Sequence, residues 1–244
     1  KLPNGEFLQK MSSGLSQQVK EGQDIYSWYM PKWLGVNPEN GDPQWEVVGE
    51  AGSRTAKNDY KSATFQVVGK ASPLFQGGLN TMLRYKGFSL SANAAFVYGN
   101  KVFNAARITM DSDGAYTDYN MMSIDNGLGW SRWENPGDNA THPKPALNGN
   151  KSAHGVSSRY LEDGSFFRLK NVTFSYSFPQ KWMKKIKMQG IRLYVAADNI
   201  ATISKFSGMD PEVRLESTSW ELAGTYSTNY PVPFSVVGGI EITF

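Results

Sequence analysis

The sequence predicts an all-β fold, a transmembrane antiparallel β-barrel of which the chain supplies the last five or so strands together with long loops. Five segments alternate apolar and polar residues over more than the roughly 9–11 residues that a tilted strand needs to cross the hydrocarbon layer. Their connections alternate short and long, and aromatic residues, 13% of the chain, gather near the strand ends. Short turns on one side, long loops on the other and two aromatic girdles are typical of membrane barrels. The segments are 75–86, 88–103, 165–178, 190–203 and 232–244.

The first two segments form a predicted hairpin. Alternation runs from Leu79 to Tyr85, and the dipeptide Lys86-Gly87 then provides a tight turn. Two alternating runs separated by two or three residues that include Gly indicate a β-hairpin. One face of the second strand is apolar and the other polar: Phe88, Leu90, Ala92, Ala94, Phe96 and Tyr98 against Ser89, Ser91 and Asn93.

The third and fourth segments repeat the pattern on either side of a basic connector, residues 181–187. Val172 and Phe174 alternate with Thr173 and Ser175 in the third, and the fourth sets Ile191, Leu193, Val195 and Ala197 against Arg192, Tyr194 and Asp198. We therefore expect Phe96, Phe174, Leu193 and Ile240 to contact lipid, and Ser91, Thr173, Arg192 and Glu241 to face the barrel interior.

The final segment places Phe234, Val236, Gly238, Ile240, Ile242 and Phe244 on one face. We expect Val236, Ile240, Ile242 and Phe244 to form the C-terminal signal of a membrane barrel. Five strands are too few to close such a barrel, because the smallest single-chain examples have 8. An open edge would expose unpaired N–H and C=O groups to lipid. The chain is thus expected to be a piece of a longer protein, whose remaining barrel pairs with both outer strands.

The rest of the chain is predicted to be loop. Residues 1–74 form an expected extracellular loop region with short strands near 26–30 and 45–48, and 75–244 form the region of the strands, with long loops at 104–158 and 207–230. With the short turns in the periplasm, five crossings that start outside place Phe244 in the periplasm. Aromatic faces in the loops could stack on sugars or peptides, meet a lid protein, or form small loop cores. The residues concerned are Tyr26, Trp28, Tyr29, Trp33, Trp130 and Trp133.

Composition and motifs argue against several other functions. The formal charge of +3, from 25 basic and 22 acidic residues, gives no concentrated basic face for nucleic acid. Cysteine is absent, and no catalytic, cofactor or metal motif is found, so no enzyme activity is expected. His142 and His154 are expected to be solvated loop residues. Asp111 and Asp113 are expected to be ordinary turn acids, because the later ligands of a calcium loop are missing.

Several stretches resemble the SusC/RagA-type family of TonB-dependent outer-membrane transporters, in the family's order from about residue 70 to the end. Two departures concern Phe234, where a basic or polar residue is expected, and the loop 104–158, which is unlike a common family loop. The stretches that carry the resemblance are 85–91 (YKGFSLS), 98–104 (YGNKVFN), 159–173 (RYLEDGSFFRLKNVT), 176–179 (YSFP), 198–200 (DNI), 207–213 (SGMDPEV) and 230–233 (YPVP).

The resemblance implies a barrel of about 22 strands in outer-membrane lipid, with its lumen plugged by an N-terminal domain. It also implies energy from TonB through that missing N-terminal part, a SusD-like surface lipoprotein as lid, and oligosaccharides or peptides as cargo. Two other functions stay open from the sequence. The first is a soluble all-β carbohydrate-binding protein, suggested by the loop aromatics, and the second is a barrel of the same family with an adhesion or assembly role.

Overall fold

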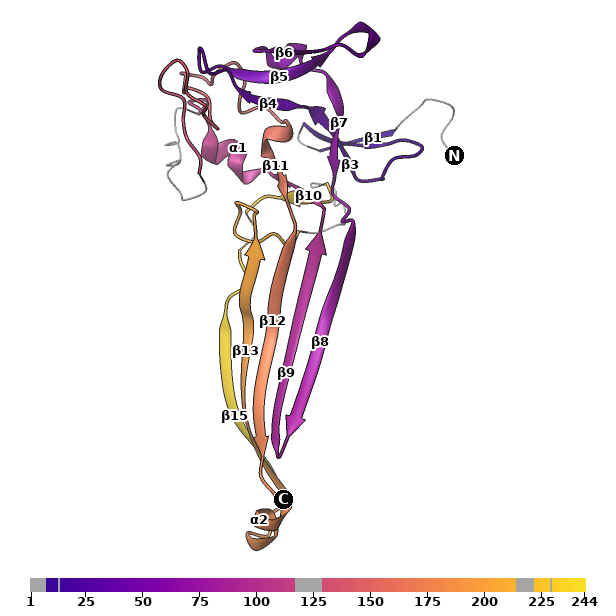
Figure 1. Ribbon diagram of the computed structural model, residues 1–244, viewed down its shortest axis with the longest axis vertical. Coiled ribbons are helices and arrows are strands. Elements are labelled where there is room, and N and C mark those ends of the chain that lie inside the picture. Colours follow the sequence, from indigo (N-terminus) through magenta and orange to yellow (C-terminus); the bar gives the residue numbers. More distant parts are fainter. Residues whose placement is uncertain (1–7, 13, 117–128, 214–221, 229) are drawn as a thin grey trace. The chain divides into compact units, whose positions relative to one another are not determined.

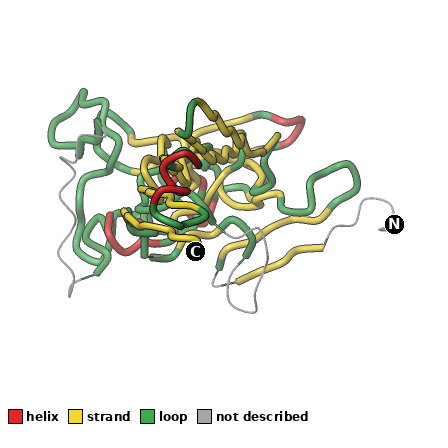
Figure 2. The backbone as a smooth tube through the Cα atoms, turned by 90° about the horizontal axis from the view of Figure 1, so that it is seen from below, coloured by secondary structure: helices red, strands yellow, loops and turns green. Residues whose placement is uncertain are grey.

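The computed structural model describes residues 8–12, 14–116, 129–213, 222–228 and 230–244 (Figure 1). Strands dominate, and the helices are short (Figure 2). In the described part of the chain, neither α-helix is long and apolar enough to span a bilayer. The chain divides into two compact units: unit 1 comprises 1–72, 100–163 and 206–229, and unit 2 comprises 73–99, 164–205 and 230–244.

Unit 2 is one antiparallel sheet of five long strands that lie side by side in the order β15-β13-β12-β9-β8 (Figure 1). The fold class predicted from the sequence is confirmed, and the strand bounds agree closely for four of the five segments. A short helix, α2 (Gln180–Lys185), lies in the connection between β12 and β13. The strands are β8 (Phe75–Tyr85), β9 (Phe88–Tyr98), β12 (Phe166–Ser177), β13 (Gly190–Ser204) and β15 (Ser235–Thr243).

The prediction for the remaining segment, a single strand over 88–103, is wrong after residue 98. β9 ends at Tyr98, and a separate strand in unit 1, β10 (Lys101–Asn104), pairs with partners outside the long sheet. The break falls at Gly99, whose φ of 82° is in the left-handed region. A Cβ atom there would also lie 2.6 Å from the side chain of Leu74, so only glycine fits this bend. Apolar residues return at Val102 and Phe103, directly after Gly99-Asn100-Lys101, and this made the two strands look like one in the sequence.

The described residues of unit 1 form three small sheets, which the sequence predicted only in part. The expected strands near 26–30 and 45–48 are present, and the others have too short or too polar a pattern to stand out. In strand 15–19, for example, Ser16, Gln17 and Gln18 are all buried. The sheets are β1 (Leu8–Ser12), β2 (Leu15–Val19), β3 (Ser27–Pro31) and β7 (Phe65–Lys70); β4 (Trp33–Val36), β5 (Pro43–Val48) and β6 (Arg54–Lys57); and β11 (Leu161–Asp163), β10 and β14 (Thr225–Tyr226).

The segments of unit 1 have a hydrophobic core of their own. Trp28 and Tyr160 have no exposed surface, and Phe103 packs between them. One α-helix, α1 (Ala106–Asp111), and three 3-10 turns complete the unit: η1 (Glu50–Gly52), η2 (Tyr60–Ser62) and η3 (Ser158–Tyr160). The described residues of 104–158 are therefore part of a folded unit, although most of them form no regular structure.

The register of the long sheet places its side chains on two faces of opposite character. Directly paired residues of antiparallel strands share a face, and Leu193 pairs with both Tyr176 and Ile240. On the other face, Thr173 pairs with Ser91, and Arg192 pairs with Glu241. The two sets expected from the sequence to lie on opposite faces do so.

A bulge at Lys170 shifts the pattern within β12. Leu169 pairs with Ala94 and Asn171 with Asn93, so β12 advances by two residues while β9 advances by one. A one-residue slip exchanges the two faces. The bulge therefore places Arg168 on the same polar face as Asn171, although the two positions differ by an odd number. Without it, the apolar and polar sets of β12 would be mixed on both sides of the sheet.

Candidate functional site

The apolar face of unit 2 has the character of a lipid-contacting surface. Its large side chains are unusually exposed for a folded protein: Leu83 is 63% accessible, Phe174 48% and Ile240 66%. Soluble monomers rarely expose contiguous apolar patches beyond a few hundred Å². The predicted C-terminal residues also lie here, because Val236, Ile240 and Ile242 pair with the apolar positions Ala197, Leu193 and Ile191.

The opposite face carries a ladder of polar contacts across neighbouring strands. The Asn171 amide donates to the Asp198 carboxylate at 2.7 Å, and the Arg168 Nε–H donates to the Thr202 hydroxyl at 3.0 Å. Farther along, Arg192 and Glu241 form an ion pair at 3.5 Å. Such a face suits water or a polar partner and is poorly suited to hydrocarbon.

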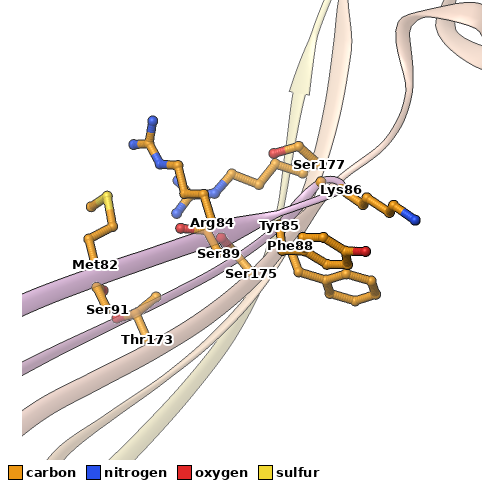
Figure 3. Close-up of a pocket in the computed structure, with 12 residues that line it drawn as sticks. Met82, Arg84, Tyr85, Lys86, Phe88, Ser89, Ser91, Thr173, Ser175 and Ser177 are labelled. Carbon is orange, nitrogen blue, oxygen red and sulfur yellow. The ribbon is translucent and has the colours of Figure 1, made fainter.

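Toward the Lys86-Gly87 turn, this polar face forms a hollow, and the residues that line it are drawn in Figure 3. Arg84 on β8 and Ser89 on β9 are directly paired, and Ser175 on β12 continues the same row. The hollow lies on the side expected to face a barrel lumen. Its lining of hydroxyl and guanidinium groups can bind polar or anionic groups, but within the described residues no cluster has the composition of a metal site.

In unit 1, a buried network of charges links segments that are distant in sequence. The Arg107 guanidinium donates to Asp111 at 2.7 Å and to Glu162 at 3.0 Å, and the Arg132 guanidinium donates to Asp113 at 2.9 Å. Arg159 also donates to Asp113. Buried charges are tolerated when they are paired and hydrogen-bonded in this way.

Asp113 lies in a turn, as expected, whereas Asp111 is the last residue of α1, and both carboxylates are buried. The expectation that His142 is solvated was wrong, because this residue is only 2% accessible. Their partners explain the difference, because His142 Nε2 lies 3.3 Å from Asp111 and the arginines neutralise both carboxylates. Burial alone would raise the pKa of Asp111, but the contact with His142 and the charges of Arg107 and Arg159 lower it below its usual value.

The network positions two of the six aromatic residues proposed from the sequence. The Arg107 guanidinium lies 4.2 Å from the ring centre of Trp130, and that of Arg159 lies 5.1 Å from Trp33. Cation–π contacts at these distances restrain the rings. Trp130 also lines a surface hollow together with Ser131, Arg132, Glu134, Asp138, Asn139 and Ala140.

The remaining four aromatics do not line that hollow. Trp133 packs over Gly41, where a Cβ atom would lie 2.4 Å from the ring, and its indole N–H donates to the Pro38 carbonyl at 2.8 Å. Tyr29 packs against Phe65. Tyr26 packs against the core, and Trp28, fully buried, donates from its indole to the Lys101 carbonyl. The six residues therefore do not form one continuous surface.

The arginines that organise this region were missed by sequence reasoning. Arg132 and Arg159 stand 19 and 46 residues from Asp113. No local spacing marks such pairs, because folding alone brings them together. Arg159 is the first residue of the stretch 159–173, which carries part of the family resemblance. This position was the signal in the sequence that could have pointed to it.

The comparisons with known proteins agree with this geometry. No family model matches the chain. TonB-dependent receptor P3 of Formosa agariphila is 28% identical over 233 residues, which cover 91% of this chain and 21% of that protein. TonB-dependent receptor SusC of Bacteroides thetaiotaomicron is 26% identical over 249 residues, which cover 98% of this chain and 21% of that protein. The chain thus spans about a fifth of these curated relatives.

Solved structures show the same fold. The chain matches the RagAB peptide transporter with a TM-score of 0.73 at 23% identity, over 100% of this chain and 24% of that one. It matches the RagAB peptide importer in its closed-closed state with a TM-score of 0.72 at 24% identity, over 100% and 24%. Both units, with the long strands and the loop segments, therefore have counterparts in a known barrel.

Proposed function

Because this chain belongs to the SusC/RagA-type TonB-dependent receptors, we propose that it is part of an importer that spans the outer membrane as a β-barrel. The observation that carries the proposal is the sheet of unit 2. Its strands have membrane-crossing length, one face is apolar and exposed, and the other is polar and hollowed. Substrate would pass along the polar face without any bond being broken, and this role needs no catalytic residue.

In this proposal the turns at Lys86-Gly87 and 179–189 lie in the periplasm. Residues 1–74, 104–158 and 207–230 would then lie outside the cell, and Phe244 in the periplasm. Val236, Ile240, Ile242 and Phe244 would form the signal by which the barrel is recognised for assembly. Support comes from the lengths of the connections, which alternate as in other outer-membrane barrels.

The proposed partners are a SusD-like surface lipoprotein and TonB. Support for a lid comes from the likeness to the solved RagAB peptide transporter and to the sequence relative SusC. Tyr26, Tyr29, Trp33, Trp130 and Trp133 are the proposed contacts for lid or ligand. Aromatic residues are enriched in such interfaces. Trp28 would support them from within the core, since it has no accessible surface.

The proposed cargo is an oligosaccharide or a peptide. A ring held over a buried arginine, as Trp130 is over Arg107, presents a rigid face on which a sugar or a peptide can stack. The hollow beside it carries both acidic and basic side chains, and these offer hydrogen bonds to either class.

The test combines deletion of the full-length gene with uptake assays. Cells lacking the receptor should lose import of one fluorescent pool, either oligosaccharide or peptide, and regain it with the wild-type gene. Trp130→Ala should reduce import several-fold, whereas Leu147→Ala, at an exposed loop position, should not. Affinity purification from native membranes should also recover a surface lipoprotein. Unchanged import of both pools and the absence of any co-purifying lipoprotein would refute the proposal.

A further inference from the structure

A cluster of lysines surrounds helix α2 at one end of the unit 2 sheet. The connection 179–189 contains Lys181, Lys184, Lys185 and Lys187 and no acidic residue. Within the described residues, none of these four lysines has an ion-pair partner, and the helix lies beyond the ends of the strands (Figure 1). Four uncompensated charges on seven residues repel one another, so an anionic surface would stabilise the segment.

Helix α2 also exposes an apolar face. Trp182 is 53% accessible, and Ile186, the C-cap residue that directly follows the helix, is 50% accessible. Residues four apart lie on the same side of a helix. Met183 points the other way and is buried, and the Met188 N–H donates to the Met183 carbonyl, which fixes the end of the helix. Because Met183 holds the helix against the protein, the neighbouring Trp182 is left exposed.

This apolar face continues onto the lipid-facing side of the sheet through a row of aromatic rings. Trp182 lies 6.2 Å from Phe178, which lies 5.1 Å from Tyr176, and Tyr176 lies 4.6 Å from Phe88. Phe88 stacks in turn on Phe174 at 5.7 Å, and both rings lie on the apolar face. Tryptophan and tyrosine are enriched where a membrane protein crosses from hydrocarbon to headgroups.

From these observations we propose that α2 is a membrane-interface anchor whose lysines bind the phosphates of anionic phospholipids. Trp182 and Ile186 enter the boundary of the acyl chains, and Lys184, Lys185 and Lys187 extend to the headgroups. The inference rests on the membrane location given under the proposed function. It goes beyond the proposed function by naming the class of lipid that is bound and the segment that binds it.

Two readouts on the full-length receptor in nanodiscs test the anchor. An environment-sensitive dye on Trp182→Cys should be quenched by brominated lipid, as should the same dye on Ile240→Cys, whereas a dye on Lys57→Cys in unit 1 should not. If position 240 is quenched and position 182 is not, the anchor is refuted while the membrane location stands. If neither is quenched, the membrane location itself fails.

The lipid class is tested by the phosphatidylglycerol that co-purifies after extraction from mixed phosphatidylcholine and phosphatidylglycerol bilayers. Each lysine near an anionic surface contributes a factor of about five in binding. Replacing Lys184, Lys185 and Lys187 with Gln should therefore lower the retained phosphatidylglycerol at least about fivefold. The matched control replaces the exposed Lys20, Lys57 and Lys61 of unit 1 with Gln and should leave it unchanged. An equal loss in both triple variants, or in neither, would overturn the assignment of the lipid.

Discussion

Arg132 donates a hydrogen bond to Asp113 at 2.9 Å, and the Asp113 side chain has no accessible surface. The second oxygen of the same carboxylate accepts from Arg159. One carboxylate thus joins the segment after α1 to two others that are 19 and 46 residues away. Because Arg159 also lies over Trp33, the orientation of that proposed contact ring depends on this pairing.

The first prediction is that Asp113→Asn destabilises unit 1 by about 3–5 kcal/mol, because removing one partner leaves a buried charge uncompensated. The change should increase protease cleavage in the loops of the full-length receptor and leave the strands of unit 2 protected. Limited proteolysis followed by mass spectrometry measures this. Glu39→Gln, at an exposed position, is the matched control and should behave as wild type. Equal cleavage rates in both variants would show that the network does not hold the loops.

The second prediction concerns acid. The pKa of Asp111 is lower in the folded protein than its ordinary value of 3.8, so folding favours the charged form. That stabilisation is fully present above pH 3.8 and is lost as the pH falls through the lower, folded pKa. The difference in loop stability between wild type and Asp111→Asn should therefore be constant near neutral pH and shrink below about pH 3.8. Protease-resistance midpoints of both proteins across pH measure it. A difference that grows on acidification would contradict the pairing.

The long strands could be predicted because one physical requirement sets their pattern over many residues. An antiparallel sheet between lipid and a polar interior needs alternation in every strand, and this requirement is visible from Leu79 to Tyr85 without any tertiary information. The exceptions are local. Gly99 bends the chain inside a segment that was predicted to be one strand, and the bulge at Lys170 changes the phase of the alternation in β12.

The loop unit could not be predicted in the same way, because its stability comes from pairs distant in sequence. Asp111 and Asp113 have the local signature of turn acids, and only the folded chain brings Arg132 and Arg159 to them. Ser16 and Gln17 are polar in sequence yet buried, since Gln17 donates to the Ala223 carbonyl at 2.8 Å. Hydrophobic periodicity contains no information on such contacts. The sequence singled out six aromatic residues as a group, but their division between core and surface needed the structure, which buries Trp28 completely.

The third prediction concerns the two faces of β12. A lysine at Phe174, on the apolar face, should cost a substantial part of the roughly 2–4 kcal/mol that a lysine costs at the bilayer midplane, and a lysine at the neighbouring Thr173 should cost much less. Unfolding of the full-length receptor from bilayers by denaturant measures both. Phe174→Leu corrects for the loss of the stack on Phe88, which lies 5.7 Å away. Similar costs for the two lysines would refute the assignment of lipid and lumen faces.

The fourth prediction is the orientation of the connections. Single cysteines replacing Gly137 and Lys184 should differ in their reaction with a membrane-impermeant maleimide on intact cells. The first should be labelled and the second should be labelled only after the outer membrane is permeabilised. Any native cysteines elsewhere in the receptor would be replaced beforehand, and this chain has none. Labelling of position 184 alone on intact cells would invert the proposed topology.

The last prediction is that both outer strands of the unit 2 sheet pair with further polypeptide. In the described sheet, β8 is paired only with β9 and β15 only with β13, so each has one edge without a partner. In hydrocarbon an unpaired N–H or C=O group costs several kcal/mol, and open sheet edges do not occur there. The chain refolded alone in detergent should therefore show fast hydrogen exchange at the outward amides of β8 and β15 and slow exchange in β12. In the full-length receptor all these amides should exchange slowly. Slow exchange at both edges of a monomeric isolated chain would mean that five strands close on themselves, and the barrel assignment would then be wrong.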